Sequence, residues 1–409
     1  MSLRVVHINT SVKGGAGIAA LRLQQAQQGI GVQAAYLAKD LCIDFNGTKQ
    51  ENTYFRYKKP SLLSRILNKI LPKKSLVMAK ELAKIKPNLR CEMASLPFGQ
   101  VDLLDHPLVK TADIIHLHWV VGLVDYPSFF KNNKKPIVWT LHDMNPFLGM
   151  FHYSQDHAQN KAVAGDLEHR VKNIKAKALL NLKMGAVVSP SSWLLASAKS
   201  AKVFIKNTSF TEIANAIDIK KYAPSPDSTQ QHQELTLLYT AGNLENPRKG
   251  VDLVIDALNN YPAPITLLTV GKGQLTIKNP KVKIVPLGYI DNPQEMIASY
   301  WQADALLLPS REDNLPNTMV ESLCCGTPVI SFNTGGMQQY IQEGINGCLS
   351  ATIDSEGLRQ AIIRFQETQS QFIAQSIATS ARTHFQGKNQ AKKYLNLYLE
   401  LQNKITPKN

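Results

Sequence analysis

Residues 309–331 read PSREDNLPNTMVESLCCGTPVIS, and this stretch decides the fold of the second half of the chain. The apolar run at 305–308 just before it is expected to be a buried strand. A helix is expected to open at Asn317 and Thr318, and a Gly-Thr-Pro turn leads into another buried strand at 328–330. Strand, helix and strand in this order are typical of an α/β protein with a parallel sheet.

Two carboxylates flank this expected helix start. Asp313 lies in the loop after the first strand, and Glu321 follows eight residues later. The first turn of a helix offers free backbone N–H groups and the positive end of the helix dipole, which together bind phosphate. Carboxylates beside it can accept hydrogen bonds from sugar hydroxyls. A pyrophosphate site flanked by hydroxyl acceptors is what an enzyme of nucleotide sugars needs.

Length and composition restrict the class of protein. With 409 residues, of which 44% are hydrophobic, the chain is expected to form two domains of roughly 200 residues, each with its own core. The start, MSLRVVHIN, lacks the apolar region of a signal peptide, and no apolar run reaches the roughly 18 residues of a transmembrane helix. The cysteines show neither a disulfide framework nor metal-type spacing, so reduced thiols in the cytoplasm are expected for Cys42, Cys91, Cys324, Cys325 and Cys348.

The net charge of +15 is concentrated in one segment. Residues 54–90 contain eleven Lys or Arg and one acid, Glu81, which leaves +10 in this window. Within it, residues 61–71 read SLLSRILNKIL and would form a basic amphipathic helix. Such a helix favours contact with an anionic membrane surface, here the cytosolic face of the inner membrane, although an ordinary surface helix is the alternative. Nucleic acid is not expected as a partner, because the basic residues alternate with Leu and Ile rather than aromatics.

Alternating strand and helix patterns divide the chain into two α/β domains, each expected to be Rossmann-like and doubly wound. The expected ranges are an N-terminal domain at 1–217, a linker at 218–234, a C-terminal domain at 235–388 and a last helix within 389–409 that packs back toward the first domain. The expected strands are 4–8, 32–37, 114–118, 137–141 and 186–188, then 235–240, 265–270, 282–286, 305–308 and 329–332. Ligands would bind at the carboxyl ends of the strands, in a cleft between the domains.

Two loops between a strand and a helix carry groups that suit phosphate. Residues 14–17, GGAG, follow the first strand, and glycine lets a backbone approach phosphate or sugar closely. A plain tight turn is the alternative. Residues 242–250, GNLENPRKG, place Arg248 and Lys249 just before a helix. Two cations there can neutralise a diphosphate leaving group, although a surface Arg-Lys pair is often merely solvated.

Three histidines lie near strand ends. His116 and His118 are two residues apart in DIIHLHW, and His142 closes an apolar strand in WTLHDM. Zinc would need further ligands, which the neighbouring sequence does not offer, so the first two are interpreted as strand histidines at a domain edge. His142 is expected to emerge into the cleft and to act there.

These segments together resemble the retaining GT-B glycosyltransferases of family four (group 1), most of all the bacterial members that build capsule, exopolysaccharide or lipopolysaccharide chains. The resemblance covers almost the whole chain. It rests on GGAG (14–17), ADIIHLHW (112–119), PIVWTLHDM (136–144), SPSSWL (189–194), NAID (215–218), RKG (248–250) and residues 309–336. It implies a hexosyltransferase-type enzyme with an acceptor-binding N-terminal domain and a donor-binding C-terminal domain facing across a cleft. The sugar would move with retention from a nucleotide-diphosphate sugar to a glycan or lipid-linked acceptor.

The resemblance also implies roles for single residues. Asp313 stands at the first Glu of the family's E-x7-E motif and would hold sugar hydroxyls, and Glu321 stands at the second, which contacts the ribose. His142 matches a histidine that touches the donor sugar, so that His142 and Asp313 would be the catalytic pair. The glycine loop, the RKG turn and the helix start would approach the diphosphate, and a Tyr-Ile pair would frame the base. The positions so implied are Gly15, Gly17, Arg248, Lys249, Tyr289, Ile290, Asn317, Thr318 and Met319.

No cofactor is expected besides the donor substrate. The sequence offers no DxD-type loop, and the family needs no divalent metal. No side chain stands out as a covalent nucleophile, so the resemblance implies front-face attack in which the leaving phosphate helps to take the acceptor proton. Two positions depart from the family: Asn243 stands where many members have Arg, and Asp313 is one methylene shorter than Glu. Arg248 is the candidate replacement for the missing charge.

Two other functions fit parts of the sequence. A nucleotide-sugar epimerase could use the same architecture, but it would need acidic groups placed for proton abstraction, which the sequence does not offer. A non-enzymatic basic protein that docks on membrane or nucleic acid would explain the charge alone. Binding of a nucleoside diphosphate would separate the enzymes from this last alternative.

Overall fold

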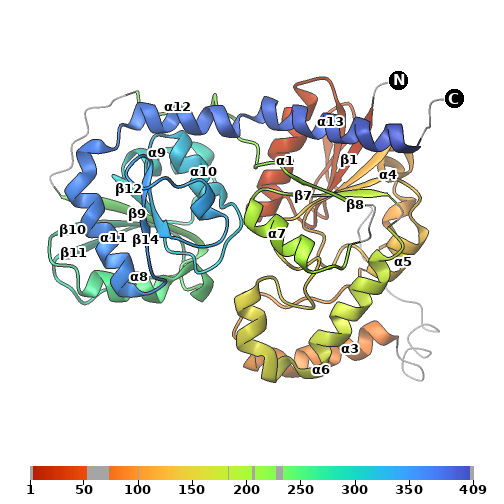
Figure 1. Ribbon diagram of the computed structural model, residues 1–409, viewed down its shortest axis with the longest axis horizontal. Coiled ribbons are helices and arrows are strands. Elements are labelled where there is room, and N and C mark those ends of the chain that lie inside the picture. The colour runs from red at the N-terminus through yellow and green to blue at the C-terminus, as the bar shows by residue number, and fades with distance from the viewer. Residues whose placement is uncertain are drawn as a thin grey trace. The chain divides into compact units, whose positions relative to one another are not determined.

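A computed structural model describes residues 3–52, 73–99, 101–182, 184–204, 208–226 and 234–405, which form two compact units (Figure 1). The N-terminal unit comprises residues 1–190, 194–213 and 391–409. The C-terminal unit comprises residues 191–193 and 214–390. The last segment of the chain thus belongs to the first unit.

The N-terminal unit is built on an eight-stranded sheet with the order β4-β3-β2-β1-β5-β6-β7-β8. The strands β2, β1, β5, β6, β7 and β8 are parallel, and the short β3 and β4 are antiparallel additions at one edge. The central strands are almost entirely buried, as expected where helices cover both faces. Their bounds are β1 (Arg4–Ile8), β2 (Gln33–Leu37), β3 (Cys42–Ile43), β4 (Lys49–Gln50), β5 (Ile114–Leu117), β6 (Ile137–Thr140), β7 (Gly185–Ser189) and β8 (Thr208–Glu212).

Helices α1 and α13 lie near β1 (Figure 1), and Tyr398 of α13 contacts both Gln27 of α1 and His116 of β5. Helix α6 is bent at Gly165, whose φ of 51° and ψ of −135° interrupt the helical conformation. The α-helices of the unit are α1 (Gly14–Gln28), α3 (Lys74–Ile85), α4 (Pro107–Thr111), α5 (Tyr126–Asn132), α6 (Ser154–Leu179), α7 (Ser192–Ser200) and α13 (Gly387–Ile405).

The C-terminal unit contains a six-stranded, fully parallel sheet with the order β11-β10-β9-β12-β13-β14. Alternate residues along its strands enter two separate apolar clusters: Leu306 and Leu308 lie in one, Ala305 and Leu307 in the other. Both faces are therefore covered. The elements are β9 (Leu235–Asn243), α8 (Val251–Asn259), β10 (Ile265–Lys272), β11 (Val282–Gly288), α9 (Pro293–Trp301), β12 (Ala305–Leu308), α10 (Asn317–Cys324), β13 (Val329–Phe332), β14 (Gly347–Ser350), α11 (Ser355–Thr368) and α12 (Ala374–Phe385).

Each sheet has one place where the winding reverses. In the N-terminal unit β1 lies between β2 and β5, and in the C-terminal unit β9 lies between β10 and β12. At such a switch point the connections leave toward opposite faces, which opens a crevice at the carboxyl ends of the two central strands. Functional side chains are therefore expected after β1 and β5 in one unit, and after β9 and β12 in the other.

The predicted fold class, two Rossmann-like doubly wound α/β domains, is confirmed, and so is each predicted strand to within a few residues. Helix α1 begins at Gly14, so the glycine-rich segment forms its first turn. The last helix, expected within 389–409, spans Gly387–Ile405. The predicted amphipathic helix at 61–71 lies outside the described residues. In the described part, no helix is both long enough and apolar enough to cross a membrane.

Candidate active site

The carboxyl ends of β9 and β12 bring three charged side chains together. Arg248 and Lys249 lie in a short 3-10 helix after β9, and Asp313 lies in the loop after β12. Lys249 Nζ is 2.5 Å, and Arg248 Nη1 3.2 Å, from the same carboxylate oxygen, Oδ2 of Asp313. We call these three residues the ion-pair cluster.

Local sequence explains why the two loops meet. The Asn246 side chain accepts a hydrogen bond from the Arg248 N–H and starts the 3-10 turn. Gly250 ends this turn with φ of 74°, and a Cβ there would lie 2.0 Å from the Pro309 carbonyl oxygen. Only glycine allows this approach. The Arg311 N–H then donates to the Arg248 carbonyl over 2.9 Å and joins the loops directly.

The environment keeps Asp313 ionised. Burial by itself would raise the pKa of this carboxyl, but the charges of Lys249 and Arg248 and hydrogen bonds from Lys249 and the Asn314 N–H outweigh burial and lower the pKa to about 2. Within the ion-pair cluster two cations thus face one ionised carboxylate, and Glu312, the preceding residue of the loop, is also buried.

Glu321 has a different environment from Asp313. It lies on α10, is buried, and accepts a hydrogen bond of 2.8 Å from the Tyr300 hydroxyl. Burial, followed by the charge of Glu321, raises the pKa of Tyr300 well above its usual value, so the phenol stays a donor. The structure thus gives the two carboxylates of the E-x7-E-like motif separate partners.

The start of α10 is as predicted, but its three residues are not equivalent. Asn317 and Thr318 are half-exposed, and Asn317 Oδ1 accepts a hydrogen bond from Asn215. Met319 is fully buried in the core, and its N–H donates to the Pro316 carbonyl over 3.1 Å. The side chain of Met319 therefore packs in the core, and the diphosphate contact expected at this residue stays a prediction.

Tyr289 and Ile290 follow β11, two strands away from β9. Tyr289 is 51% exposed, and Lys272 Nζ lies 5.2 Å from the centre of its ring. Ile290 packs against the core. The pair thus offers an open aromatic face on a fixed support, which is consistent with stacking on a base but is not directed at the ion-pair cluster by any described contact.

The glycine loop of the N-terminal unit serves packing first. A Cβ on Gly17 would lie 2.4 Å from the Ser11 carbonyl oxygen and 2.6 Å from that of Val12, so this glycine is needed for the return of its own loop. Gly15 is exposed on the first turn of α1. Of the two predicted donor-binding glycines, Gly17 therefore has a structural explanation, and a ligand contact at Gly15 stays a prediction.

His142, two residues beyond the end of β6, ends a buried row of side chains. His118 Nδ1 lies 3.1 Å from His142 Nε2, His118 Nε2 lies 2.9 Å from His7 Nδ1, and His7 Nε2 lies 2.8 Å from the Gln27 carbonyl oxygen Oε1. Burial lowers the pKa of His7 and of His142 to about 4 and that of His118 well below its usual value. We call His7, His116, His118 and His142 the histidine array. Its rings are neutral at physiological pH.

His116 has its own partners. Its Nδ1 lies 2.6 Å from the Tyr398 hydroxyl and its Nε2 lies 2.7 Å from Thr140 Oγ1. Thr140 in turn contacts the Tyr394 hydroxyl at 2.8 Å. The expectation that His116 and His118 lie at a domain edge is wrong: both are interior, because α13 covers this face of the sheet.

Three members of the array are close enough to raise the question of a metal. Ligand atoms of His7, His116 and His118 all lie within 4.8 Å of one another, so the structure supplies the third histidine that the sequence did not indicate. All six ring nitrogens of these residues, however, already make hydrogen bonds within the protein. A metal would have to replace several of them. The donor set therefore fits a hydrogen-bonded array better than a metal site.

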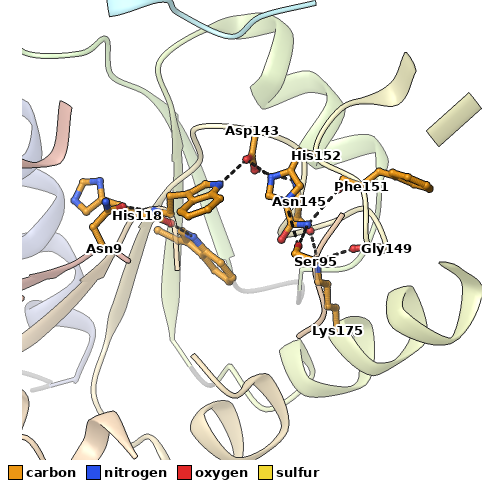
Figure 2. A network of polar contacts seen from close by, with 11 residues as sticks. Asn9, Ser95, His118, Asp143, Asn145, Gly149, Phe151, His152 and Lys175 are labelled. Carbon is orange, nitrogen blue, oxygen red and sulfur yellow. Dashed lines mark hydrogen bonds and ion pairs between the residues drawn. The ribbon is translucent and has the colours of Figure 1, made fainter. Parts of the chain in front are cut away.

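The segment after His142 is fixed by a second polar network (Figure 2). Asp143 Oδ2 accepts hydrogen bonds from Trp119 Nε1 at 2.8 Å and from His152 Nδ1 at 2.6 Å. His152 Nε2 lies 3.1 Å from Ser95 Oγ, and Asn145 Nδ2 donates a hydrogen bond to the same oxygen. This order of side chains resembles a Ser-His-Asp triad. Ser95, however, is buried, and its backbone N–H donates to the Met150 carbonyl. The network therefore acts as a brace.

Lys175 completes this brace from α6. Its Nζ donates to the carbonyls of Asn145 and Gly149, each over 2.6 Å (Figure 2). Burial lowers the pKa of Lys175 to about 7, with Asp143 and Glu168 opposing the shift. Glu168 accepts from the Gly149 and Met150 N–H groups. The loop that follows His142 is thus held at both ends.

Two hollows lie near these residues. A small cavity of about 10 Å³, room for one water molecule, is lined by residues that include His142, Asp143 and Trp119. A wider groove of about 250 Å³ follows α6 near its bend and is lined by Leu148, His157, Lys161, Gly165, Glu168, His169 and Lys172. Side chains of basic residues are the majority there.

Sequence reasoning singled out His116, His118 and His142 but missed His7, the residues that hold the far end of the array, and the brace. His7 could have been found from strand parity, because it pairs directly with His116 in the β1–β5 register. Gln27 and Tyr398, which hold the far end of the array, gave no signal, since they are 371 residues apart on two helices. His152 and Lys175 likewise lie in no sequence pattern that indicates their roles.

Comparison with known proteins agrees with this architecture. Residues 236–368, about a third of the chain, match the family described as glycosyl transferases group 1. The glycogen synthase of Thermodesulfovibrio yellowstonii is 23% identical over 348 residues, which are 70% of this chain and 68% of that protein. An uncharacterised glycosyltransferase of Methanocaldococcus jannaschii is 30% identical over 29% of this chain and 34% of its own length. The lipopolysaccharide core biosynthesis glycosyltransferase LpsE of Rhizobium meliloti is 28% identical over 28% of this chain and 35% of its own.

Solved structures match over nearly the full length. The sucrose-phosphate synthase of Thermosynechococcus elongatus has a TM-score of 0.68 at 16% identity and covers 98% of this chain and 99% of its own. Anabaena HepE in complex with UDP and glucose has a TM-score of 0.61 at 20% identity and covers 98% and 100%. The fold is GT-B. Together with the family match in the C-terminal unit, the comparisons support glycosyltransferase activity.

Proposed function

We propose that the protein is a retaining, metal-independent glycosyltransferase that takes a sugar from a nucleotide-diphosphate donor. The observation that carries this proposal is the ion-pair cluster: Lys249 and Arg248 hold one buried carboxylate, Asp313, at the switch point of a parallel sheet. Lys249 Nζ has three N–H donors, so it can bind a phosphate oxygen while keeping Asp313 in place.

The proposed reaction breaks the bond between the anomeric carbon and the diphosphate oxygen and forms a bond from the same face to an acceptor hydroxyl. The nucleoside diphosphate leaves with the electron pair, and the acceptor proton passes to its phosphate oxygen. Lys249 and Arg248 stabilise the charge that develops on this leaving group. Asp313 and His142 orient the sugar, Glu321 contacts the ribose, and Tyr289 with Ile290 frames the base.

We further propose that the acceptor is a glycan or lipid-linked glycan of a bacterial surface polysaccharide. The likeness to a lipopolysaccharide core glycosyltransferase supports this class of acceptor. A panel of nucleotide sugars, assayed with lipid-linked acceptors and followed by NMR of the product's anomeric configuration, tests the proposal. Inversion would contradict the mechanism, and no binding of any nucleoside diphosphate would contradict the function.

Such an acceptor would explain the basic segment 54–90, for which we propose peripheral attachment to the cytosolic face of an anionic membrane. Within it, α3 is described and carries exposed lysines. Each Lys or Arg near an anionic surface adds about 1 kcal/mol, and salt screens this attraction. Co-sedimentation should therefore require anionic vesicles and weaken in salt. Equal pelleting with neutral vesicles, or none with either, would contradict attachment through this segment.

A further inference from the structure

The histidine array has a property that no single histidine has. Gln27, His7, His118 and His142 form an unbroken chain of hydrogen bonds in which both nitrogens of His7 and of His118 are used. A neutral imidazole carries one N–H and one lone pair. Each contact between two rings therefore needs an N–H on one side and a lone pair on the other. Fixing the proton on one ring fixes it on all three.

The far end of the chain sets the direction. Gln27 donates through Nε2 to the Tyr398 oxygen over 2.8 Å, which turns its carbonyl oxygen toward His7. A carbonyl oxygen only accepts, so His7 carries its proton on Nε2. His118 must then donate from Nε2 to His7, and His142 must donate from Nε2 to His118. Tyr398 has one proton, which goes to His116 Nδ1.

We propose that Gln27, oriented by Tyr398, fixes the tautomer of His142 through His7 and His118, so that His142 presents a bare Nδ1 that accepts a hydrogen bond from a hydroxyl of the donor sugar. Gln27, Tyr398, His7 and His118 are then positioning residues. This inference rests on the proposed function for its ligand, but the tautomer can be measured without any ligand.

Burial and packing keep the array in one state. Gln27, His7, His116 and His118 are buried, and Tyr398, a residue of α13, is fully buried. His142 alone reaches the half-buried end of the row, and in the described part of the chain no hydrogen bond to its Nδ1 occurs. The lowered pKa values of the rings favour their neutral forms. His142 is thus suited to orient a hydroxyl and is a poor general base.

The arrangement also predicts specificity. A site built to hydrogen-bond a hydroxyl discriminates strongly against an analogue that lacks it, because the polar group of the site is then left unpaired. Because Nδ1 is an acceptor, the sugar must offer a hydroxyl or another O–H or N–H donor at this position. A donor sugar with a methoxy group there would fill the space without supplying a proton.

The experiment uses the full chain with ¹⁵N-labelled imidazole rings. In wild type, His142 Nδ1 should show the shift of an unprotonated nitrogen and Nε2 that of an N–H, with His142→Ala giving the assignment. Gln27→Leu should produce a mixture of tautomers at His142. It should also raise KM for the donor sugar about five- to tenfold while leaving the affinity for the bare nucleoside diphosphate unchanged.

Gln24→Leu is the matched control. Gln24 is buried on α1 one turn away, donates to the Ala34 carbonyl and does not contact the array. If Gln27→Leu does not fold, Tyr398→Phe removes one oxygen and frees the Gln27 amide to rotate, with the same expected result. The inference is overturned if wild-type His142 is protonated on Nδ1, or if both variants keep the wild-type tautomer. Absence of transfer from every donor would instead overturn the proposed function.

Discussion

The two units share one topological feature, a switch point in a mostly parallel sheet, but carry different kinds of side chains there. Both sheets reverse their winding once, and both collect polar side chains at the carboxyl ends of the strands that flank this point. The C-terminal unit places full charges there, two cations on Asp313. The N-terminal unit places neutral rings there, and their hydrogen bonds stay within the protein until His142. The same fold thus supports either an electrostatic or a hydrogen-bonding site, which is why fold alone does not define function.

The sharpest expected contrast between the units is their response to acid. The pKa of His7 is lowered from 6.5 to about 4, so the unfolded chain binds this proton first as pH falls. Stability should be full above pH 6.5 and decline between pH 6.5 and 4, by about 3 kcal/mol for this group at roughly 1.4 kcal/mol per pKa unit. The other buried members of the array act in the same direction.

Asp313 should act in a lower window. Its pKa falls from 3.8 to about 2, so its contribution is present above pH 3.8 and is lost between pH 3.8 and 2, by about 2 kcal/mol. Urea unfolding at several pH values measures the total loss of stability, and hydrogen exchange that resolves the two units measures the loss in each unit. Loss of protection in both units within one pH window would break the contrast.

Removal of Asp313 should have the largest effect on transfer. In Asp313→Ala, the sugar loses a charged hydrogen bond worth roughly 1.5–3 kcal/mol, so transfer should fall by about one to two decades. Asp252→Ala is the control, because Asp252 pairs with Arg311 nearby but is exposed. Wild-type kinetics in a folded Asp313→Ala enzyme would remove this residue from the active site.

Loss of Lys249 and loss of His142 are expected to affect different quantities: nucleotide affinity for Lys249 and turnover for His142. Lys249→Ala should weaken binding of a bare nucleoside diphosphate about tenfold, a loss of roughly 1.4 kcal/mol, because a phosphate contact is lost. His142→Ala should bind the nucleotide normally and turn over more slowly, since its contact is to the sugar. Isothermal titration with the nucleotide tests both expectations. Normal binding by Lys249→Ala would contradict the phosphate contact of Lys249. Loss of binding by His142→Ala would contradict a contact of His142 to the sugar alone.

Treatment with a chelator is expected to leave transfer activity unchanged, which is the smallest of these expected effects. The ion-pair cluster already supplies positive charge for the diphosphate, and the nitrogens of the three clustered histidines are occupied by hydrogen bonds. Transfer should therefore survive treatment with EDTA and dialysis. Activity that disappears and returns only with magnesium or manganese would show that the charge balance of the cluster is incomplete.

The two sites also differ in how far the sequence predicts them. In the C-terminal unit, Lys249 and Asp313 each follow a buried strand, and adjacent parallel strands must bring such loops together. In the N-terminal unit, His142 could be recognised by the same rule. The residues at the far end of its array could not, because Gln27 and Tyr398 are 371 residues apart and no local pattern indicates how the helix of Tyr398 docks. Gly17 was predicted to bind a ligand because glycine is needed in two different situations that the sequence does not distinguish. One is a backbone that packs closely against its own loop, and the other is a backbone that approaches a phosphate.

The return of α13 to the N-terminal unit has a consequence for synthesis. Domains generally fold in the order in which they leave the ribosome. Here the first unit needs Tyr394 and Tyr398, so its polar interior stays uncapped until nearly the whole chain has been made. The C-terminal unit, complete by residue 390, can fold before the first unit is finished. A nascent chain that ends near residue 213 would leave Gln27 and His116 without their phenol partners.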